Sequence, residues 1–305
     1  MTAWPELSYD AWRATGDTLH MHSQVLGKLA VVLAPPEPQL QHAALRLTGR
    51  GLETQLLPAP DGSGTFTAAL DLHRHEAVVD HSDGQERRIP LTPNRSVAGV
   101  TRDVLAAVSE VAGPVEINMR PQETSWTTPL DKDTEHATYD EAQVAAYLDA
   151  ATRAALVLAA FRAAYRGRST QVNAWWGSFD LAVNLFSGRP AEPPSQDFIM
   201  RNSMDAQDIA VGWWPGDARY PRAAFYAYAH PAPEGLAEAP LEPASARWEG
   251  AMGLFLLDWD DALAEPDPFE AALGFARSMA RHACVVCAWD PGLAASLEGT
   301  PPPVA

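Results

Sequence analysis

Apolar residues follow helical spacing in some stretches of the chain and form short strand-like runs in others. Helical spacing covers residues 10–34, 96–112 and 140–166 and predicts a helix in each stretch. The first helix should end at Pro35 and Pro36, because proline lacks the backbone N–H that continues a helix. Residues 43–91 instead contain short apolar runs separated by turns such as Asp61-Gly62, at the spacing of an antiparallel meander.

The rest of the chain contains a further block of strands followed by a helix. A helix is predicted over residues 267–289, and residues 232–246, rich in Pro, Glu and Ala, should be irregular. Because strands come in blocks and do not alternate singly with helices, the order predicts an α+β fold with mainly antiparallel sheets flanked by helices. The predicted strands are residues 114–119, 171–177, 179–187, 209–214, 223–229 and 253–257.

A polar segment at residues 120–138 is the predicted boundary between two parts of the chain. It separates an N-terminal α+β half, residues 1–138, from a C-terminal α+β half, residues 139–305. The two halves have a similar order of elements. An internal pseudo-repeat and packing as one compact unit therefore both stay open.

The excess of acidic over basic residues limits the kinds of molecule that the protein is expected to bind. The 305 residues contain 22 Lys plus Arg against 39 Asp plus Glu, a formal net charge of -17. Such a surface repels phosphate backbones and anionic lipid headgroups, so neither nucleic acid nor a membrane is expected as a partner. The first ten residues lack the basic start and apolar core of a signal peptide, and the longest apolar run, residues 154–161, is too short to span a membrane. We therefore expect a cytoplasmic protein.

Several common catalytic and cofactor-binding motifs are absent from the sequence. It contains no glycine-rich phosphate loop, no G-x-S-x-G elbow and no H-E-x-x-H zinc motif, so no cofactor and no metal are expected. Cys284 and Cys287 form a C-x-x-C pair in an apolar stretch, where packing in the core is favoured over a redox or zinc role. His73 and His75 fall where a hairpin should turn, which favours an exposed turn over a metal site.

A row of polar residues follows the first predicted helix. His20, Gln24 and Lys28 are four residues apart, so their side chains lie along one side of the helix. One interpretation is a stripe that faces water. The other is a row that faces a polar cavity, with Lys28 supplying a positive charge or an amine.

Aromatic residues next to an acid form the second candidate feature. Trp176 and Asp180 belong to a Trp-Trp-Gly-Ser-Phe-Asp run that would suit the floor of a ligand pocket, with Arg50 as a candidate partner of Asp180. Packing of these rings in the core is the alternative. Further rings could close the pocket at Trp214, Tyr226 and Tyr228.

The sequence resembles a bacterial family of unknown function, DUF5996, over most of its length. The family name brings no established activity, so the resemblance implies a shared fold and a shared pocket. The residues that carry the resemblance are Trp4-Pro5, Tyr9, Trp12, Thr18-Leu19-His20, Gln24, Gly27-Lys28, Arg50-Gly51-Leu52, Ser82-Asp83-Gly84, His136-Ala137, Tyr139, Trp176 to Ala182, Phe186 to Arg189, Trp214-Pro215-Gly216 and Phe225-Tyr226.

The chain also departs from the pattern that the resemblance implies. A histidine is expected where this chain has Asn173, and a His-Glu pair where it has Ala206-Gln207. Amide side chains neither titrate nor bind transition metals strongly, so a metal or proton-transfer site of the family would be lost or reassigned here. His22 and His230 stand where histidine is not typical, and either is a candidate replacement acid or base.

These observations lead to one main hypothesis and two alternatives. The main hypothesis is a metal-independent enzyme that carries out cyclisation, isomerisation, dehydration or hydrolysis on a small molecule in an aromatic pocket. The alternatives are a non-catalytic small-molecule-binding protein and a metal-dependent enzyme. The substrate and the oligomeric state stay open. Catalysis is assigned to His20, His22, Lys28, Asp180 and His230, and substrate binding to Gln24, Arg50, His136, Asn173, Trp176, Trp214, Tyr226 and Tyr228.

Overall fold

The computed structural model describes residues 4–299 and divides the chain into two compact units. Unit 2 consists of Ser8–Asp149 and Asn173–Asp180, and unit 1 consists of Met1–Leu7, Ala150–Val172 and Leu181–Ala305. The division falls within helix α3 (Glu141–Ala163), not at the predicted boundary of residues 138 and 139. Residues 173–180 belong with the first part of the chain because Ala174 exchanges both backbone hydrogen bonds with Leu45.

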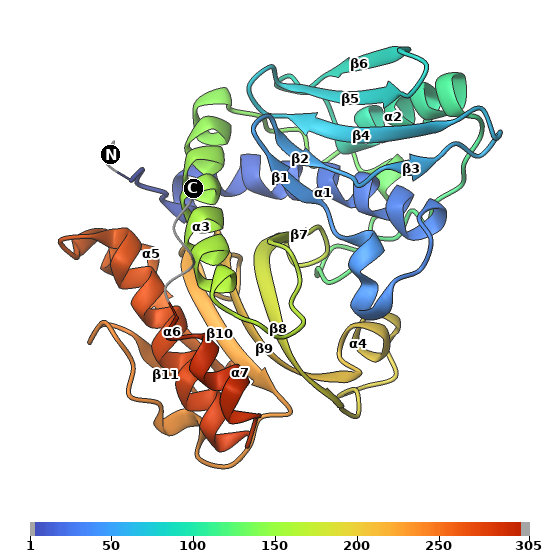
Figure 1. Cartoon of the computed structure of the whole chain (residues 1–305). Helices are drawn as coiled ribbons and strands as arrows, with labels where there is room; N and C mark the ends of the chain where they lie inside the picture. The colour runs from blue at the N-terminus through green and yellow to red at the C-terminus, as the bar shows by residue number, and fades with distance from the viewer. Residues whose placement is uncertain (1–3, 300–305) are drawn as a thin grey trace, which may run out of the picture. The chain divides into compact units, whose positions relative to one another are not determined.

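Unit 2 contains the predicted meander. Its strands pair antiparallel in the order β1-β2-β4-β5-β6, with β3 on β4, and are drawn in blue to cyan in Figure 1. Helices α1 and α2 both contact the sheet, and α1 also contacts α2. The elements are α1 (Tyr9–Leu33), a short 3₁₀ helix (Pro38–Ala43), β1 (Arg46–Thr48), β2 (Gly51–Glu53), β3 (Leu57–Pro58), β4 (Thr65–Asp71), β5 (Glu76–His81), β6 (Glu86–Pro90), α2 (Val97–Ala112), a second 3₁₀ helix (Leu130–Lys132) and β7 (Asn173–Trp175).

Helix α1 lies in the core of unit 2. Every residue from position 21 to position 30 is buried, so this stretch of the helix has no water-facing side. The helix ends at Leu33, before the two prolines, as the sequence predicts. Packing requires glycine at position 27, because a Cβ there would lie 2.0 Å from the ring of Trp176.

The strand predicted at residues 114–119 is not formed. These residues join none of the strands in the described part of the chain. The run has no neighbouring strand with which to form a ladder of backbone hydrogen bonds, and the carbonyl oxygen of Met119 accepts from the backbone N–H of Leu130 instead. Side chains of α1 bond the residues that follow it instead, at Arg120 and Gln122.

Unit 1 contains a second antiparallel sheet, in which β8, β9, β10, β12 and β11 are neighbours in that order. Helix α6 contacts β9, β10 and β12, and Figure 1 shows it beside β10. The elements are β8 (Asp180–Pro190), α4 (Phe198–Ser203), β9 (Ala206–Trp214), β10 (Ala224–His230), a 3₁₀ helix (Leu236–Glu238), β11 (Arg247–Glu249), β12 (Leu254–Asp258), α5 (Trp259–Ala264), α6 (Pro268–Val286) and α7 (Pro291–Ser296). The chain therefore has the predicted α+β fold with antiparallel sheets.

The two faces of the unit 1 sheet differ in chemistry. On one face, Trp213 and Phe225 are opposite each other in the register and both contact the ring of Trp259 in α5. On the other face, which we call the aromatic face, Tyr226 is opposite Gly212 and Trp214 is opposite Ala224. The first face is fully buried, whereas Tyr226 on the aromatic face is half-buried.

Among residues 4–299, one helix is long and apolar enough to cross a membrane by length and composition alone. This helix is α3, and half of its most apolar window is buried within the structure. The core helix of a soluble protein passes the same test, so the observation is weak evidence for a membrane span.

Candidate functional site

The polar row of α1 faces protein, not water. Gln24 is fully buried and Lys28 is 3% exposed, while His20 is half-buried. The prediction that these three side chains form one row is correct, and the interpretation of a water-facing stripe is wrong. All three contact segments that are distant in the sequence but belong to the same unit.

Gln24 and Lys28 hold the loop that follows residue 119. The Gln24 side chain donates to the carbonyl oxygen of Gln122 at 2.8 Å and accepts from the Gln122 backbone N–H at 3.0 Å. Lys28 Nζ donates to the carbonyl oxygen of Arg120 at 2.8 Å and to Gln122 Oε1 at 3.3 Å. Burial lowers the pKa of Lys28 from 10.5 to about 8. These contacts position the loop on α1, a role that the sequence did not indicate.

His20 joins this helix to the Trp176–Asp180 turn. Its Nε2 lies 3.0 Å from the carbonyl oxygen of Trp176 and 2.9 Å from that of Gly177. Carbonyl oxygens only accept, so Nε2 carries a proton in this arrangement. The imidazole stacks on the ring of Phe179 at 4.9 Å and meets the edge of Trp126 at 5.5 Å. His20 is therefore held in one orientation among aromatic rings.

The turn itself is tightly packed. The indole N–H of Trp176 donates to the carbonyl oxygen of Ala43 at 3.0 Å, and a Cβ at Gly177 would lie 2.0 Å from a carboxylate oxygen of Glu123. Phe179 has a φ of +57°, which a phenylalanine rarely adopts. Ser178 Oγ donates to Asp180 Oδ1 at 2.5 Å. Trp176 is therefore fixed by packing and by its hydrogen bond to Ala43.

Arg50 is not the partner of Asp180. Its guanidinium bonds Glu53 at 2.7 Å and Asp80 at 3.2 Å, both within the unit 2 sheet. Strand pairing places β2, β4 and β5 side by side, and this brings Asp80 to Arg50. The prediction that Arg50 pairs with Asp180 is wrong, because a turn position says nothing about which strand lies beside it.

A histidine–aspartate pair is the main feature that the sequence analysis missed. His136 Nδ1 lies 2.6 Å from Asp133 Oδ2, and the Asp133 side chain is 2% exposed. Asp133 Oδ1 accepts from the backbone N–H groups of Glu135 and His136, both at 3.1 Å. His136 Nε2 makes no hydrogen bond with the residues that the structure describes. The D-x-x-H spacing was a signal in the sequence that could have been used.

Trp126 connects this pair to His20. The rings of Trp126 and His136 are in edge-to-face contact, with their centroids 4.7 Å apart, and Trp126 also contacts the ring of His20. Trp126 belongs to the loop that Gln24 and Lys28 hold. We call His20, Trp126, Asp133 and His136 the histidine cluster of unit 2.

His22 lies in the same unit but is buried. It is 2% exposed, and its Nδ1 has no hydrogen-bond partner among residues 4–299. Burial, and secondarily the positive charge of Arg95, lowers the pKa of His22 from 6.5 to about 3. His22 is therefore neutral at physiological pH, and this pKa is too low for an efficient general base.

Asn173 is part of a buried hydrogen-bond network. Its Oδ1 accepts from Arg46, and its Nδ2 donates to Gln41 Oε1 at 2.8 Å. The residue is fully buried. These contacts account for an amide at position 173, because an amide side chain can accept a hydrogen bond from Arg46 and donate one to Gln41 at the same time.

The remaining predicted site residues belong to unit 1. Trp214, Tyr226, Tyr228 and His230 all lie on the aromatic face of its sheet. Trp214 contacts Tyr226 at 5.2 Å, and the rings of Tyr226 and Tyr228 are nearly parallel at 6.4 Å. His230 Nε2 lies 3.2 Å from the carbonyl oxygen of Glu192. These rings therefore form a group of their own within unit 1.

Unit 1 also contains a buried acid that the sequence analysis did not select. Asp208 is 4% exposed; its Oδ2 accepts from Asn184 Nδ2 at 2.5 Å, and its Oδ1 has no partner within the described chain. Burial raises the pKa of Asp208 from 3.8 to about 7, against the opposing hydrogen bond from Asn184.

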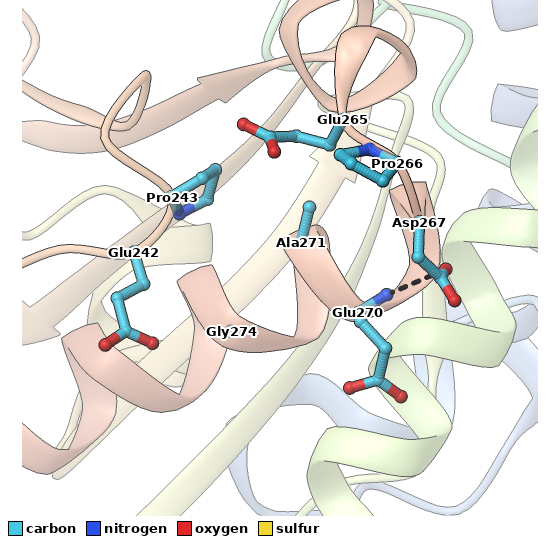
Figure 2. Close-up of a pocket in the computed structure, with 8 residues that line it drawn as sticks. All are labelled: Glu242, Pro243, Glu265, Pro266, Asp267, Glu270, Ala271 and Gly274. Atoms are coloured by element: carbon cyan, nitrogen blue, oxygen red, sulfur yellow. Dashed lines mark hydrogen bonds between the residues drawn. The ribbon is translucent and has the colours of Figure 1, made fainter.

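An open pocket of about 280 Å³ lies beside α6 in unit 1 (Figure 2). Four carboxylates surround it, and one of them, Asp267, accepts from the backbone N–H groups of Phe269 and Glu270 at the start of α6. None of the predicted site residues lines it. The lining residues are Glu242, Pro243, Glu265, Pro266, Asp267, Glu270, Ala271 and Gly274.

Comparison with known families decides the relationship of the chain. A family model described as "Family of unknown function (DUF5996)" matches residues 4–296. The chain belongs to the DUF5996 family. Searches of curated proteins and of solved structures gave no significant match.

For this DUF5996 member, Asn173 and Gln207 make structural contacts. Asn173 bonds Arg46 and Gln41, and Gln207 Oε1 accepts from Ser187 Oγ at 3.0 Å. In the described residues, no group of three or more His, Cys, Asp or Glu side chains is arranged to hold a metal ion. Cys284 is buried in α6, where burial raises its pKa to about 12, so this thiol is protonated at neutral pH.

Proposed function

We propose that this DUF5996 protein is a metal-independent enzyme that moves a proton on a small molecule, with His136 of unit 2 as the acid or base. The reaction class is cyclisation, isomerisation, dehydration or hydrolysis, each of which needs only proton transfer and orientation. The observation that carries the proposal is the Asp133–His136 pair.

The geometry of the pair suits proton transfer. A carboxylate at Nδ1 orients the imidazole and stabilises the imidazolium that forms when Nε2 takes a proton. Asp133 is itself held by two backbone N–H groups, so the pair keeps its orientation without help from a ligand. His136 Nε2 has no internal partner among the described residues, which leaves this nitrogen for a substrate.

The neighbouring rings support an apolar or planar substrate. Trp126 lies against both His136 and His20, and Phe179 stacks on His20. Aromatic side chains lower the local polarity and strengthen any hydrogen bond that a substrate makes there. In this proposal His136 replaces His20 and His22 as the proton carrier, and Gln24 and Lys28 position the loop that carries Trp126.

A non-catalytic binding protein is the second candidate. It is favoured by the polar row of α1, where Gln24 and Lys28 are already bonded to backbone atoms of the loop. Groups that are satisfied by the protein contribute to rigidity more than to chemistry. A rigid aromatic site without turnover would have this arrangement.

One experiment separates the candidates. The purified protein is incubated with a small-molecule extract of bacterial cells, and the masses in the extract are compared by mass spectrometry before and after incubation. Proton-transfer chemistry produces a compound of unchanged mass with a new retention time, or one that has gained or lost water. We expect the change to persist with EDTA and to decrease by about 10²–10⁴-fold in His136→Gln.

The control is His73→Gln, because His73 is an exposed histidine in a turn of the same unit. It should retain full turnover. A change that EDTA abolishes would indicate a metal-dependent enzyme, and a compound that is depleted and recovered intact after denaturation would indicate a binding protein. A change that is equal in wild type and His136→Gln would overturn the assignment of His136.

The partner and the location of the protein remain part of this proposal. The excess of acidic residues favours a small-molecule ligand over nucleic acid or anionic lipid. A cytoplasmic location agrees with two free cysteines.

A further inference from the structure

We propose that Ser63, His81 and Asp83 of unit 2 form a second catalytic site, which hydrolyses a neutral ester through an acyl-serine intermediate. The three side chains are linked in the order nucleophile, base and orienting acid, which is the arrangement of a serine hydrolase triad. The site shares no residue with the histidine cluster, so it does not depend on the function proposed for His136.

The pairing of β4 with β5 brings two turns together (Figure 1). In the register, Phe66 is opposite His81, so the turn that precedes β4 lies beside the turn that follows β5. Two hydrogen bonds join these turns: the Ser82 N–H donates to the carbonyl oxygen of Thr65 at 2.8 Å, and Ser82 Oγ accepts from the Thr65 N–H at 3.1 Å. Ser63, in the first turn, therefore meets His81 at the end of β5.

The distances between the three residues suit proton transfer. Ser63 Oγ lies 3.2 Å from His81 Nε2, and His81 Nδ1 lies 2.8 Å from Asp83 Oδ1. The backbone N–H of Asp83 also lies near Nδ1, at 3.3 Å. The shorter contact places the proton on Nδ1, because a carboxylate only accepts. His81 Nε2 is then the acceptor of the Ser63 O–H and can take its proton.

Burial differs between the base and the nucleophile. The His81 side chain is 1% exposed, whereas Ser63 is an exposed residue that a substrate can reach. Hydrogen bonds from the side chain and backbone of Gln85, followed by the one from His81, hold the pKa of Asp83 well below its usual range. Asp83 is therefore charged at neutral pH and stabilises the imidazolium that forms when Nε2 takes a proton.

Gly64 leaves room for the acyl group and supplies a donor. Its φ is +152°, and a Cβ there would lie 2.4 Å from Ser82 Oγ and 3.4 Å from His81 Nε2, so glycine keeps the edge of the imidazole uncovered. The Gly64 N–H makes no hydrogen bond with the described residues. In the proposed site this N–H donates to the oxyanion, the role that the residue after the nucleophile has in α/β-hydrolases.

A second carboxylate, that of Asp61, contacts the nucleophile. The Ser63 N–H donates to Asp61 Oδ1 at 2.8 Å, and hydrogen bonds from the Ser63 side chain and backbone lower the pKa of Asp61. A carboxylate of lowered pKa is a weak base, so His81 is the group that takes the hydroxyl proton. Asp61 and Asp83 both place negative charge beside the serine and disfavour an anionic acyl group. The substrate class is therefore a neutral ester.

The reaction proceeds in two stages. Ser63 Oγ bonds to the carbonyl carbon of the ester while its proton passes to His81 Nε2. The bond from that carbon to the leaving oxygen then breaks, and Nε2 returns the proton to the departing alcohol. Water next attacks the acyl-serine, gives one proton to Nε2 and releases the carboxylic acid as that proton returns to Ser63 Oγ. One ester and one water thus become one acid and one alcohol.

The test uses two probes of serine reactivity on the purified full-length protein. Hydrolysis of 4-nitrophenyl acetate is followed by absorbance, and covalent labelling by an alkyl fluorophosphonate is located by mass spectrometry of peptides. In the labelling, the serine oxygen bonds to phosphorus and fluoride leaves. We expect hydrolysis to slow about 10²-fold in Ser63→Ala and in His81→Gln. The label should be on Ser63 in the wild type and absent from both variants.

Asp83 acts through His81, so it is a positioning residue. Asp83→Asn keeps the size of the side chain but removes its charge, and it should slow hydrolysis about tenfold or more. Asp83→Glu keeps the carboxylate and should recover part of the rate. The reverse order of the two rates would show that Asp83 contributes packing alone and would contradict its role.

The matched controls are Ser195→Ala and His73→Gln. Both residues are exposed, and Ser195 Oγ accepts from the backbone N–H of Asp197. Both variants should hydrolyse the ester at the wild-type rate. Ser63→Ala changes an exposed residue and should fold even if His81→Gln, at a buried one, does not, and circular dichroism checks each variant. Equal hydrolysis by Ser63→Ala and the wild type, or a label on a different serine, would overturn the proposal.

Discussion

Both units contain an antiparallel sheet and helices, but the buried ionisable groups that they contain differ. In unit 2, His22 is buried as a neutral base, and burial lowers its pKa to about 3. In unit 1, Asp208 is buried as an acid, and burial raises its pKa to about 7. Both shifts have the same cause, since a medium of low polarity disfavours the charged form. The comparison teaches that similar antiparallel architectures can respond to pH in opposite directions.

The largest expected effect is that of Asp208. Its folded-state pKa lies above the unfolded value of 3.8, so the folded protein binds more protons between about pH 4 and pH 7 and stability falls as pH rises through this range. The loss amounts to about 4 kcal/mol at 1.36 kcal/mol per pKa unit. Asp208→Asn should remove this loss. Urea unfolding followed by circular dichroism at pH 4.5 and pH 8 measures it, and a variant with the wild-type pH dependence would contradict the assignment.

The next effect compares a glycine in each unit. Gly27→Ala forces a Cβ against the Trp176 ring, which is buried and bonded to Ala43, so we expect a loss of about 3 kcal/mol in the free energy of unfolding. Gly212→Ala meets the far end of the Tyr226 ring, which is half-buried, so its cost should stay below that of Gly27→Ala, at about 1 kcal/mol. Thermal and urea unfolding of both variants tests this, and equal losses would show that the two rings are held equally firmly.

His22 should produce a smaller effect of the opposite sign. Its folded-state pKa lies below the unfolded value of 6.5, so stability rises with pH from about 3 to 6.5. At pH 5 the contribution of His22 to stability should be about 2 kcal/mol smaller than at pH 8, so the free energy of unfolding of His22→Gln relative to wild type should be about 2 kcal/mol more favourable at pH 5 than at pH 8. His73→Gln, at an exposed turn, should leave the pH dependence unchanged. A difference that persists in His22→Gln would place the acid sensitivity elsewhere.

The smallest effect concerns the loop of unit 2. Gln24→Met removes two hydrogen bonds to Gln122 but preserves most of the side-chain volume, so we expect a loss of about 1–2 kcal/mol. Amide hydrogen exchange should increase at Gln122, whose N–H is bonded to Gln24 in the wild type. Unchanged exchange at this amide would mean that Gln24 does not hold the loop.

The sequence predicted most elements of regular structure. The helices at α1, α2 and α3 and the meander of β1 to β6 agree with the expected ranges within a few residues. Helical spacing and turn residues are local properties of the sequence, and the folded chain has the helices and turns that they predict. The failed strand at residues 114–119 shows the limit of such signals, because a strand also requires a partner that its own residues cannot specify.

The candidate site was predicted only in part. The row of His20, Gln24 and Lys28 was visible because helix geometry relates residues four apart. Its contacts with Trp176, Gly177 and Gln122 were not, since they join segments about 100 or more residues apart. Asp133 was missed although the D-x-x-H spacing places it three residues before His136, because the spacing alone does not show that the aspartate is buried and bonded to the imidazole.

By itself, the sequence determined the α+β class, the positions of most helices and strands, the excess of acidic over basic residues and the membership of residues 4–296 in one family. Only the tertiary structure decided that Gln24 and Lys28 hold a loop, that Arg50 bonds Glu53 and Asp80, and that Trp214 and Tyr226 belong to unit 1. Periodicity is a property of neighbouring residues, and it is read directly from the chain. Burial, strand pairing and the charges around a residue depend on which distant segments come into contact. Those contacts are formed only in the folded tertiary structure.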